Sequence, residues 1–467
     1  MVEITPILDN KSSIPLYIQL SNYIKQEIGA GRIQPNEKLP SKRKLAKYLE
    51  LSLNTIQAAY DQLRAEGYVE SKLRKGIFVV RLEEEVLPNQ LSPQTAPTKK
   101  EQKWININID FNSGKVDLEH FPYVIWRKLT IQSLYEDQSE YFNIGDSKGE
   151  LSLREEIAKY LFFSRGVKCS ADQIVIGAGT QILIHLLCLL IGKEHVYAME
   201  EPGFHRTRAA FQDLGVMLHS ISLDEDGMEI NQLKNSEATV AYVTPSHQFP
   251  LGMVMPISRR IELLKWATEV GGYIIEDDYD SEFRYKGKPI PSLQGLDSNG
   301  NVIYLGTFSK SLIPSIRISY LVLPPELSQK YEEHFSIYKQ TASRLHQETL
   351  FRFMNEGHWY NHLNKMRTLY RKKQHTFIEA IKVHLGEHVN IIGEKSGLHL
   401  VLEVNNGMTE AELTSSAMAI GVKVYPLSIY FANSIDNRKP KILLGFGGLS
   451  ELEIHSGIQL LAKAWLI

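Results

Sequence analysis

A lysine between hydroxyl side chains, in the stretch GTFSKSLIPSIR (residues 306–317), has neighbours that could hold a phosphorylated aldehyde. The amine of Lys310 could form a Schiff base with the carbonyl carbon. Thr307 and Ser309 could donate hydrogen bonds to a phosphate, and Arg317 could bind the same phosphate through two parallel N–H groups. A lysine among serines is more often a plain surface residue, so this stretch needs support from elsewhere in the chain.

A second stretch, GYIIEDDYDSEF (residues 272–283), brings two carboxylates to the end of an apolar, strand-like run. Asp277 and Tyr279 are two positions apart and therefore lie on one face if the strand continues. The aspartate could keep a pyridine nitrogen protonated, and the tyrosine hydroxyl could bond an oxygen on the same ring. Two other interpretations of the stretch are a solvated acidic strand end and a magnesium site.

A glycine turn precedes both stretches, in QIVIGAGTQILIHLL (residues 173–187). The backbone amides of Gly179, Thr180 and Gln181 would face an anion at the start of a helix, where the helix dipole favours negative charge. Such turns also occur in α/β proteins that bind no ligand there. Taken together, the three stretches supply a Schiff-base amine, a partner for a pyridine nitrogen, a donor to a ring hydroxyl and a phosphate cradle. These are the needs of pyridoxal 5'-phosphate, so we expect this cofactor and no metal ion.

The elements that would position these residues predict an α/β domain after residue 105. Apolar strand-like runs alternate there with helical patterns, as in QIVIGAG, ATVAYVTP, GYIIEDD and NVIYLGT. This alternation is typical of a large, mostly parallel sheet covered by helices. Residues 81–104, which precede the domain, contain three prolines and no regular apolar pattern, which predicts a flexible linker.

The first 80 residues predict a small helical module. Apolar side chains recur on one side of residues 14–28, and Ser41 is a suitable N-cap for a second helix. A third helix begins near Ser52 and turns three polar residues outward: Asn54, Thr55 and Gln57. Two short helices joined by a tight turn have helix-turn-helix geometry.

The segment YVESKLRKGIFVV (residues 68–80) predicts two strands around a turn, which is the form of a wing. The turn consists of Arg74, Lys75 and Gly76. Between Lys38 and Lys75, nine Lys and Arg residues face four Asp and Glu residues, whereas the whole chain has a formal net charge of −2. Local positive charge binds phosphates, and polar side chains of the third helix can reach base edges. We therefore interpret the module as a DNA reader; the alternative is a helical interaction module whose charges are simply solvated.

Composition excludes several classes of protein. The 467 residues include only two cysteines, Cys169 and Cys188, without CxxC spacing, which fits a reducing compartment. The start lacks the basic segment and apolar run of an export signal. The most apolar window, ILIHLLCLLIG (residues 182–192), is too short to span a bilayer. We expect a cytoplasmic protein without membrane contact.

The segment from Gly31 to Val69, with its N-cap serines and basic second helix, is similar to the winged helix-turn-helix of GntR-type bacterial transcription regulators. The resemblance covers about residues 10–80, and we place the DNA-binding domain at residues 1–80. It implies phosphate contacts at the start of the second helix. Such proteins often carry arginine at the second position of their S-x-x-T stretch, where this chain has Leu53. The expected DNA contacts are Ser41, Lys42, Arg43, Ser52, Asn54, Thr55, Gln57, Arg74, Lys75 and Gly76.

Residues 105–467 resemble a fold-type I aminotransferase, with a smaller C-terminal α+β subdomain from about residue 330. The stretches AMEEPGFHR, TPSHQFPLG, IIEDDYDSEF and GTFSKSLIPSIRISYLVLPP resemble the MocR subfamily, in which a GntR-type reader is fused to an aminotransferase-like domain. The resemblance implies an internal aldimine at Lys310, with Asp277 rather than Asp278 at the pyridine nitrogen and Tyr279 at the ring hydroxyl.

The resemblance also implies contacts outside the three stretches. Phe204 stands where these proteins tend to carry a ring-stacking tyrosine, so stacking is retained and a hydroxyl is lost. His247 or Gln248 stands where aminotransferases place an asparagine near the ring. Either residue could take that role.

An amino-acid effector needs a cation for its carboxylate, and Arg206 matches one such position of the subfamily. The second position aligns with Lys439, beside Arg438. Lysine lacks the planar fork of arginine, so a carboxylate should bind there more weakly or in another geometry. The expected effector is therefore a γ-aminobutyrate-like amine or amino acid, or pyridoxal 5'-phosphate itself.

Two functions follow from these expectations. The first is a regulator that binds double-stranded DNA with two half-sites and responds to the effector. The resemblance implies that it is a homodimer with head-to-tail, domain-swapped subunits. The second is a working aminotransferase with an accessory N-terminal segment.

Overall fold

The computed structural model describes residues 4–73, 75–81, 107–135, 140–285, 290–432 and 439–466. The chain divides into two compact units, Met1–Lys103 and Trp104–Ile467, each of which is described by itself. Most of the predicted linker, residues 81–104, lies outside the described residues. Among the described residues, no helix is both long enough and apolar enough to cross a membrane.

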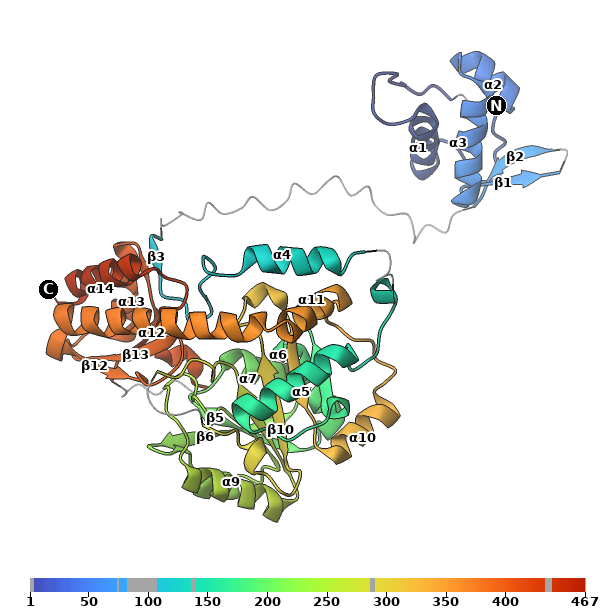
Figure 1. Cartoon of the computed structure of the whole chain (residues 1–467). Helices are drawn as coiled ribbons and strands as arrows, with labels where there is room; N and C mark the ends of the chain where they lie inside the picture. Colours follow the sequence, from blue (N-terminus) through green and yellow to red (C-terminus); the bar gives the residue numbers. More distant parts are fainter. Residues whose placement is uncertain are drawn as a thin grey trace. The chain divides into compact units, whose positions relative to one another are not determined.

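The N-terminal unit is a winged helix-turn-helix, as the sequence predicts (Figure 1). It contains α1 (Leu16–Gly29), α2 (Lys42–Leu49), α3 (Leu53–Ala65) and the antiparallel hairpin of β1 (Val69–Lys72) with β2 (Gly76–Val79). The predicted caps are present, because the hydroxyl oxygens of Ser41 and Ser52 accept hydrogen bonds from the amides of Lys44 and Thr55. Buried apolar side chains from all of these elements form one core, which includes Leu20, Ile24, Leu45, Ile56, Leu63 and Val79.

The second unit is built on an eight-stranded mixed sheet with the strand order β4-β11-β10-β9-β8-β5-β6-β7. Its strands are β4 (Ile174–Gly177), β5 (Val196–Glu201), β6 (Met217–Asp224), β7 (Gly227–Met228), β8 (Val240–Val243), β9 (Tyr273–Asp278), β10 (Val302–Thr307) and β11 (Ser319–Val322). The five strands from β10 to β6 pair in parallel, while β11 and β7 are antiparallel to their neighbours. Four of these strands, β4, β8, β9 and β10, are the apolar runs predicted from the sequence.

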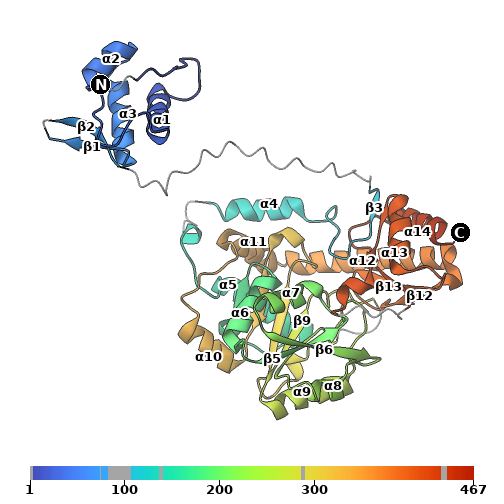
Figure 2. The ribbon, with the colours of Figure 1, turned by 180° about the vertical axis from the view of Figure 1, so that it is seen from behind.

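Helices cover both faces of this sheet (Figures 1 and 2). Alternate side chains of β10 enter cores on opposite faces: Ile303 and Leu305 pack in a core with α6 (Thr180–Ile191), α7 (His205–Asp213) and α10 (Pro325–His334). Val302 and Tyr304 point the other way, toward cores formed with α4 (Tyr123–Gln132), α5 (Leu151–Arg165), α8 (Ile230–Lys234), α9 (Ile257–Val270) and α11 (Arg344–Asn355). This is the three-layer α/β arrangement of the expected fold class.

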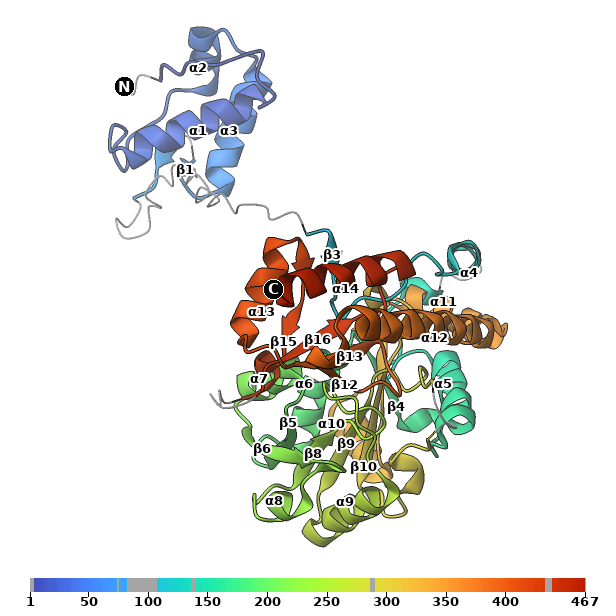
Figure 3. The same ribbon diagram turned by 90° about the vertical axis from the view of Figure 1, so that its left-hand side faces the viewer.

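A smaller subdomain packs around a second, antiparallel sheet of order β12-β13-β16-β15 (Figure 3). Its strands are β12 (Val389–Ile392), β13 (His399–Val404), β15 (Tyr425–Pro426) and β16 (Lys441–Gly445), and its helices are the long α12 (His358–His384), α13 (Glu410–Ala419) and α14 (Glu451–Trp465). A short parallel pair, β3 (Ile109–Asp110) with β14 (Val422–Lys423), ties the start of the unit to this subdomain. Its core therefore includes Ile109 and Phe111 together with residues from Met366 onward.

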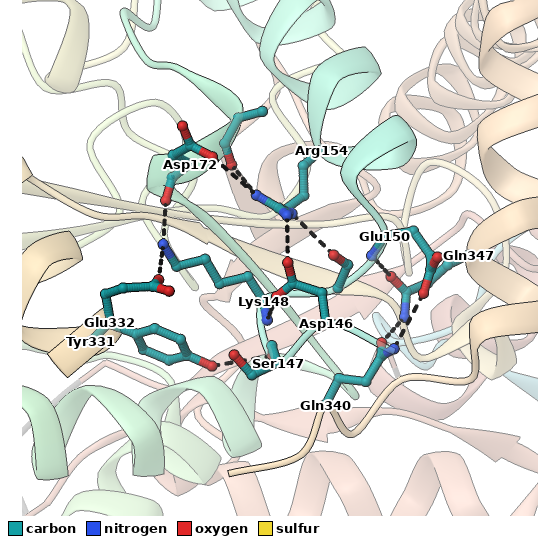
Figure 4. A network of polar contacts seen from close by, with 12 residues as sticks. Asp146, Ser147, Lys148, Glu150, Arg154, Asp172, Tyr331, Glu332, Gln340 and Gln347 are labelled. Carbon is teal, nitrogen blue, oxygen red and sulfur yellow. Dashed lines mark hydrogen bonds and ion pairs between the residues drawn. The ribbon is translucent and has the colours of Figure 1, made fainter. Parts of the chain in front are cut away.

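A network of polar contacts fixes the turn that leads into α5 (Figure 4). Buried Arg154 donates to the carbonyl oxygen of Gly149 at 3.0 Å and to Asp146 at 3.1 Å. Lys148 Nζ donates to the carbonyl oxygen of Asp172 at 2.9 Å, and the amide of Glu150 donates to Gln347 at 2.9 Å. The turn is thereby held against α11 and against the start of β4, the strand that carries the predicted glycine turn.

Candidate cofactor site

The three stretches predicted from the sequence meet at one edge of the large sheet. In the strand register Gly177 of β4 lies beside Ser319 of β11, and Ser319 lies beside Thr307 of β10. On the other side of β10, Leu305 lies beside Asp277 of β9. The glycine turn, the acidic strand end and the lysine stretch are therefore neighbours, although more than 100 residues separate the first from the last.

Asp277 carries the clearest sign of a missing partner. Its side chain is buried, and one carboxylate oxygen, Oδ2, accepts a hydrogen bond from the hydroxyl of Tyr242. The other oxygen, Oδ1, is buried without a hydrogen-bond partner. Burial raises the pKa of Asp277 to about 7, although the Tyr242 hydrogen bond acts in the opposite direction. A buried acceptor of this kind costs free energy unless a donor reaches it, and a protonated pyridine nitrogen would be such a donor.

Asp278, the neighbouring carboxylate, is fully engaged within the protein. Its Oδ2 accepts from Arg165 Nε at 2.7 Å and from the hydroxyl of Tyr304 at 2.6 Å. Burial alone would raise the pKa of Asp278, but the charge of Arg165 and these hydrogen bonds outweigh it and hold the pKa below its usual value. The two carboxylates therefore differ: Asp277 has an oxygen without a partner, whereas Asp278 holds the strand end in place.

Lys310 lies half-buried at the same edge, in the loop after β10. Its Nζ donates a hydrogen bond to the backbone carbonyl of Ser113, a residue from the start of the unit. Burial lowers the pKa of Lys310 to about 8. At pH 7, Lys310 is then neutral in roughly a tenth of the molecules, and the neutral amine is the form that attacks a carbonyl carbon.

The predicted phosphate cradle is assembled around Gly179 and Arg317. Gly179 is the N-cap of α6 and has a φ of 98°, which favours glycine. A Cβ atom at this position would stand only 2.1 Å from Arg317 Nη2, so the glycine lets the guanidinium approach the helix start. Arg317 Nη2 also donates to the carbonyl oxygen of Ala178 at 3.1 Å. The first amides of α6, those of Thr180 and Gln181, have no carbonyl partner inside the helix and can face an anion.

Hydroxyl groups line the adjacent strand ends. Thr307 Oγ1 lies 3.0 Å from Ser309 Oγ and accepts from Ser319 Oγ at 2.9 Å. These groups can donate to a phosphate after small rotations about their C–O bonds. The residues predicted for phosphate binding therefore lie close together, with one difference: the amide of Gly179 donates to the carbonyl oxygen of Gly177 at 2.8 Å, which leaves the amides of Thr180 and Gln181 to face an anion.

The two candidates from TPSHQFPLG have different surroundings. Gln248 is committed to the backbone, since its side-chain amide donates to the carbonyls of Pro202 at 2.9 Å and Phe249 at 2.6 Å. His247 Nδ1 instead lies 2.9 Å from the Tyr279 hydroxyl and 2.9 Å from Asp280 Oδ1. A chain of polar groups thus runs from Asp280 through His247 to Tyr279, and this favours His247 as the residue that orients the tyrosine.

Phe204 has an aromatic partner, Phe249, that was not predicted from the sequence. Its ring is stacked on Phe249 with centroids 3.9 Å apart, and it meets Tyr279 edge-on at 5.1 Å. Three further contacts were not predicted from the sequence, those of Tyr242, Arg165 and Ser113. Each contacts a predicted site residue from a remote segment, and nothing in its local sequence signals that contact.

The residues predicted for effector binding are placed apart. Arg206 is exposed and lines a cavity of about 760 Å³, together with Pro314 from the lysine loop and Lys115. Lys439 lies two residues before β16 with 68% of its side chain exposed, and it forms an ion pair with Glu403 at 3.0 Å. Arg438 lies outside the described residues.

The predicted DNA contacts lie on α2, α3 and the hairpin. Lys42 and Arg43 are in the first turn of α2, and Asn54 is exposed in the first turn of α3. Lys75 and Gly76 are exposed at the hairpin, whereas Arg74 lies outside the described residues. Ser41, Ser52, Thr55 and Gln57 already make hydrogen bonds within the unit.

Comparison with known proteins agrees with this two-part organisation. Residues 106–432 match the family of class I and II aminotransferases, and residues 16–79 match the gntR family of bacterial regulatory proteins. The large unit is also similar to solved aminotransferases. A kynurenine aminotransferase of Pyrococcus horikoshii, solved in complex with PMP, is 26% identical, with a TM-score of 0.68 over 77% of this chain and 91% of that one.

The same combination of domains occurs in full-length relatives. The HTH-type transcriptional regulator YdeL of Bacillus subtilis is 46% identical over the whole of both chains. A protein described as "Probable rhizopine catabolism regulatory protein MocR", from Rhizobium meliloti, is 32% identical over 98% of this chain and 96% of its own. The chain belongs to the MocR subfamily of GntR-type transcription regulators, with a winged helix-turn-helix reader and a fold-type I aminotransferase domain.

The cofactor of the aminotransferase domain is pyridoxal 5'-phosphate, and the residues at the sheet edge fit it. The unpartnered Oδ1 of Asp277 and the glycine at position 179 are the features that this cofactor explains. Among the described residues, no group of three or more His, Cys, Asp and Glu side chains could hold a metal ion.

Proposed function

We propose that this regulator senses a small amine, an amino acid or pyridoxal 5'-phosphate itself through Lys310 and passes the signal to its DNA reader. One observation supports the proposal most strongly. A buried Asp277 oxygen without a hydrogen-bond partner and the half-buried Lys310 lie at the same edge of the sheet. A further relative supports a role for the cofactor in transcriptional control. The HTH-type pyridoxine biosynthesis transcriptional regulator PdxR of Corynebacterium glutamicum is 28% identical over 94% of this chain and 93% of its own.

When bound, the cofactor supplies an electrophilic carbonyl carbon that reacts reversibly with amines. Lys310 would hold that carbon, and its lowered pKa makes exchange with a competing amine possible near neutral pH. Asp277 would accept from the ring nitrogen, and Tyr279 would donate to the ring hydroxyl while His247 holds the tyrosine in place. Gly179, Thr180, Gln181, Thr307, Ser309 and Arg317 would hold the phosphate.

The proposed effector enters next to this site. Arg206 lines the 760 Å³ cavity that also reaches Pro314, four residues after Lys310 in the chain. An exposed guanidinium there can bind a carboxylate through two parallel hydrogen bonds. Because Lys439 is paired with Glu403, Arg206 is the stronger candidate of the predicted effector residues.

We also propose a homodimer, acting in the cytoplasm where the DNA lies. Apolar side chains gather on the surface of α4 and on the segment that follows it: Tyr123, Val124, Ile131, Leu134, Phe142 and Ile144 are all about half exposed or more. A patch of exposed apolar side chains often marks a protein interface, and we propose that these side chains form one. Two readers in one dimer would bind two half-sites.

The alternative is an active aminotransferase, favoured by the intact set of cofactor residues. Sustained formation of a keto acid from an amino acid, at rates of the order of one per second, would support it. A sensor is instead expected to react with the amine once, without sustained formation of a keto acid.

The test of the proposal is the visible absorption of the full-length protein after loading with pyridoxal 5'-phosphate. The wild type should show an absorption band that borohydride abolishes, and the reduced cofactor should remain on the peptide that contains Lys310. Lys310→Ala should lose this band, while Lys330→Ala, which removes an exposed lysine of α10, should keep it. A reducible band in Lys310→Ala would contradict the assignment.

A further inference from the structure

The first residue of α3 is a leucine whose side chain stays outside the core. Leu53 is 48% exposed, whereas Ile56, Ala59, Tyr60 and Leu63 of the same helix are buried. The N-terminal residues of a recognition helix are those that contact base edges in the major groove. An apolar side chain is therefore presented at the position where sequence is read.

Several polar residues near Leu53 are already hydrogen-bonded within the reader. Ser52 Oγ accepts from the amide of Thr55 at 3.1 Å and lies 2.8 Å from the Thr55 hydroxyl. Gln57 Oε1 accepts from Lys42 Nζ at 2.5 Å, and its amide donates to Asp61 at 2.6 Å. Bidentate reading of a base by Gln57 would require both of these groups.

Asn54 differs from these residues. It is exposed, and its side-chain amide makes no hydrogen bond to the part of the reader that the structure describes. The surface at the start of α3 thus includes one apolar side chain, Leu53, beside one available amide, Asn54. An amide suits adenine, whose N7 and amino group it can bind together.

We infer that Leu53 contacts the 5-methyl group of a thymine, so that the start of α3 selects an A·T base pair. Thymine alone among the four bases presents a methyl group in the major groove, and apolar side chains contact it. Asn54 would bind the adenine edge at the same or the adjacent pair. An arginine at position 53 would instead favour guanine, through its O6 and N7 atoms.

Single exposed apolar side chains are common and need no partner. If Leu53 were only an exposed side chain without a partner, removing a thymine methyl group would have the same effect on DNA affinity with and without the Leu53 side chain. The inference rests on α3 being the recognition helix, which the winged helix-turn-helix fold establishes, and not on the proposed effector or on the cofactor.

The test uses full-length protein and a duplex that the wild type selects from a random-sequence pool. Each thymine is replaced in turn by deoxyuridine, which removes the methyl group and leaves the hydrogen-bonding edge unchanged. We expect one position in each half-site at which wild-type affinity falls about fivefold, the effect of losing one buried methyl contact. Leu53→Ala should bind the thymine duplex more weakly and should not distinguish thymine from uracil at that position.

Two further variants make the test specific. Ile7→Ala removes a different apolar side chain of the reader, one that is fully exposed, and should keep the thymine preference. Leu53→Arg should shift the preferred base at that position to guanine. The inference is overturned if no thymine in the selected duplex is sensitive to uracil, or if Leu53→Ala retains the wild-type sensitivity.

Discussion

Two adjacent carboxylates, Asp277 and Asp278, have opposite environments at the end of one strand. Asp278 is bonded to Arg165 and Tyr304, and its pKa is held below the usual value. Asp277 keeps one oxygen without a partner, and its pKa is raised to about 7 by burial. Alternation along the strand predicted only that Asp277 and Tyr279 share a face, and the choice of Asp277 over Asp278 came from the family resemblance.

Substitution should separate the two roles. Asp277→Asn should weaken cofactor binding by about 10- to 100-fold, the worth of one hydrogen bond to a charged group, with little change in the melting temperature of the cofactor-free protein. Asp278→Asn leaves Arg165 without its buried counter-charge, and should lower the free energy of unfolding by about 3–5 kcal/mol. Cofactor titration would measure the affinity of both variants, and thermal melting would measure their stability. If the two variants lost the same affinity and the same stability, the separate roles of Asp277 and Asp278 would be contradicted.

Some residue roles could not be predicted from the sequence. The family resemblance places Lys439 at an effector position, and the sequence did not predict the ion pair that Lys439 forms with Glu403 on a neighbouring strand. Thr55 and Gln57 lie half-buried on α3, and their side chains are occupied by hydrogen bonds to Ser52, Lys42 and Asp61. Side-chain pairs of this kind depend on how elements pack, and periodicity does not report them.

At the scale of elements, the sequence predicted the parts that local chemistry determines. Apolar runs indicated β4, β8, β9 and β10, and serine caps indicated the starts of α2 and α3. The strand order that brings Thr307, Ser319 and Gly177 side by side is a property of the whole sheet, and it became visible only in the structure.

The strand end of β5 contains a carboxylic acid that should make stability depend on pH. Glu200 is 2% exposed, and its Oε2 accepts from Thr244 Oγ1 at 2.6 Å. Burial raises its pKa to about 7, whereas an unfolded chain has a pKa of about 4.3. The folded state thus binds the proton more tightly, and this contribution is present in full below about pH 4.3 and is lost as pH rises through 7.

Glu200→Gln removes that titration without changing the side-chain size. Between pH 5 and 8, the free energy of unfolding of the cofactor-free wild type should fall by about 2–3 kcal/mol relative to that of the variant. Urea unfolding at several pH values would measure the difference. Parallel curves for the two proteins would show that Glu200 does not titrate in this range.

At the scale of the whole molecule, two units with separate cores serve one regulator. The winged helix-turn-helix and the aminotransferase fold were both predictable, because each has local motifs in a fixed order. The cavity in which we propose that the effector binds was not predictable, because Arg206, Lys115 and Pro314, which line it, come from three distant segments.

The proposed dimer gives a further prediction at this scale. Ile144→Asp places a charge on an apolar side chain that is 75% exposed in the single chain. If that surface is the dimer interface, the variant should be monomeric and should bind a two-half-site duplex at least about tenfold more weakly. Leu452→Asp, at an 81% exposed position of α14, is the control that should stay dimeric. Sedimentation and DNA titration would check both, and a dimeric Ile144→Asp would place the interface elsewhere.

The most direct test of the account is the dissociation constant of the full-length protein for its selected duplex, measured in one preparation under three conditions. These are protein without cofactor, with pyridoxal 5'-phosphate, and with the cofactor plus each of a series of amines and amino acids. We expect that at least one addition changes the dissociation constant of the wild type about fivefold or more, and that the same addition leaves the dissociation constant of Lys310→Ala unchanged. The same dissociation constant for the wild type under all conditions would contradict the claim that the cofactor site controls DNA binding.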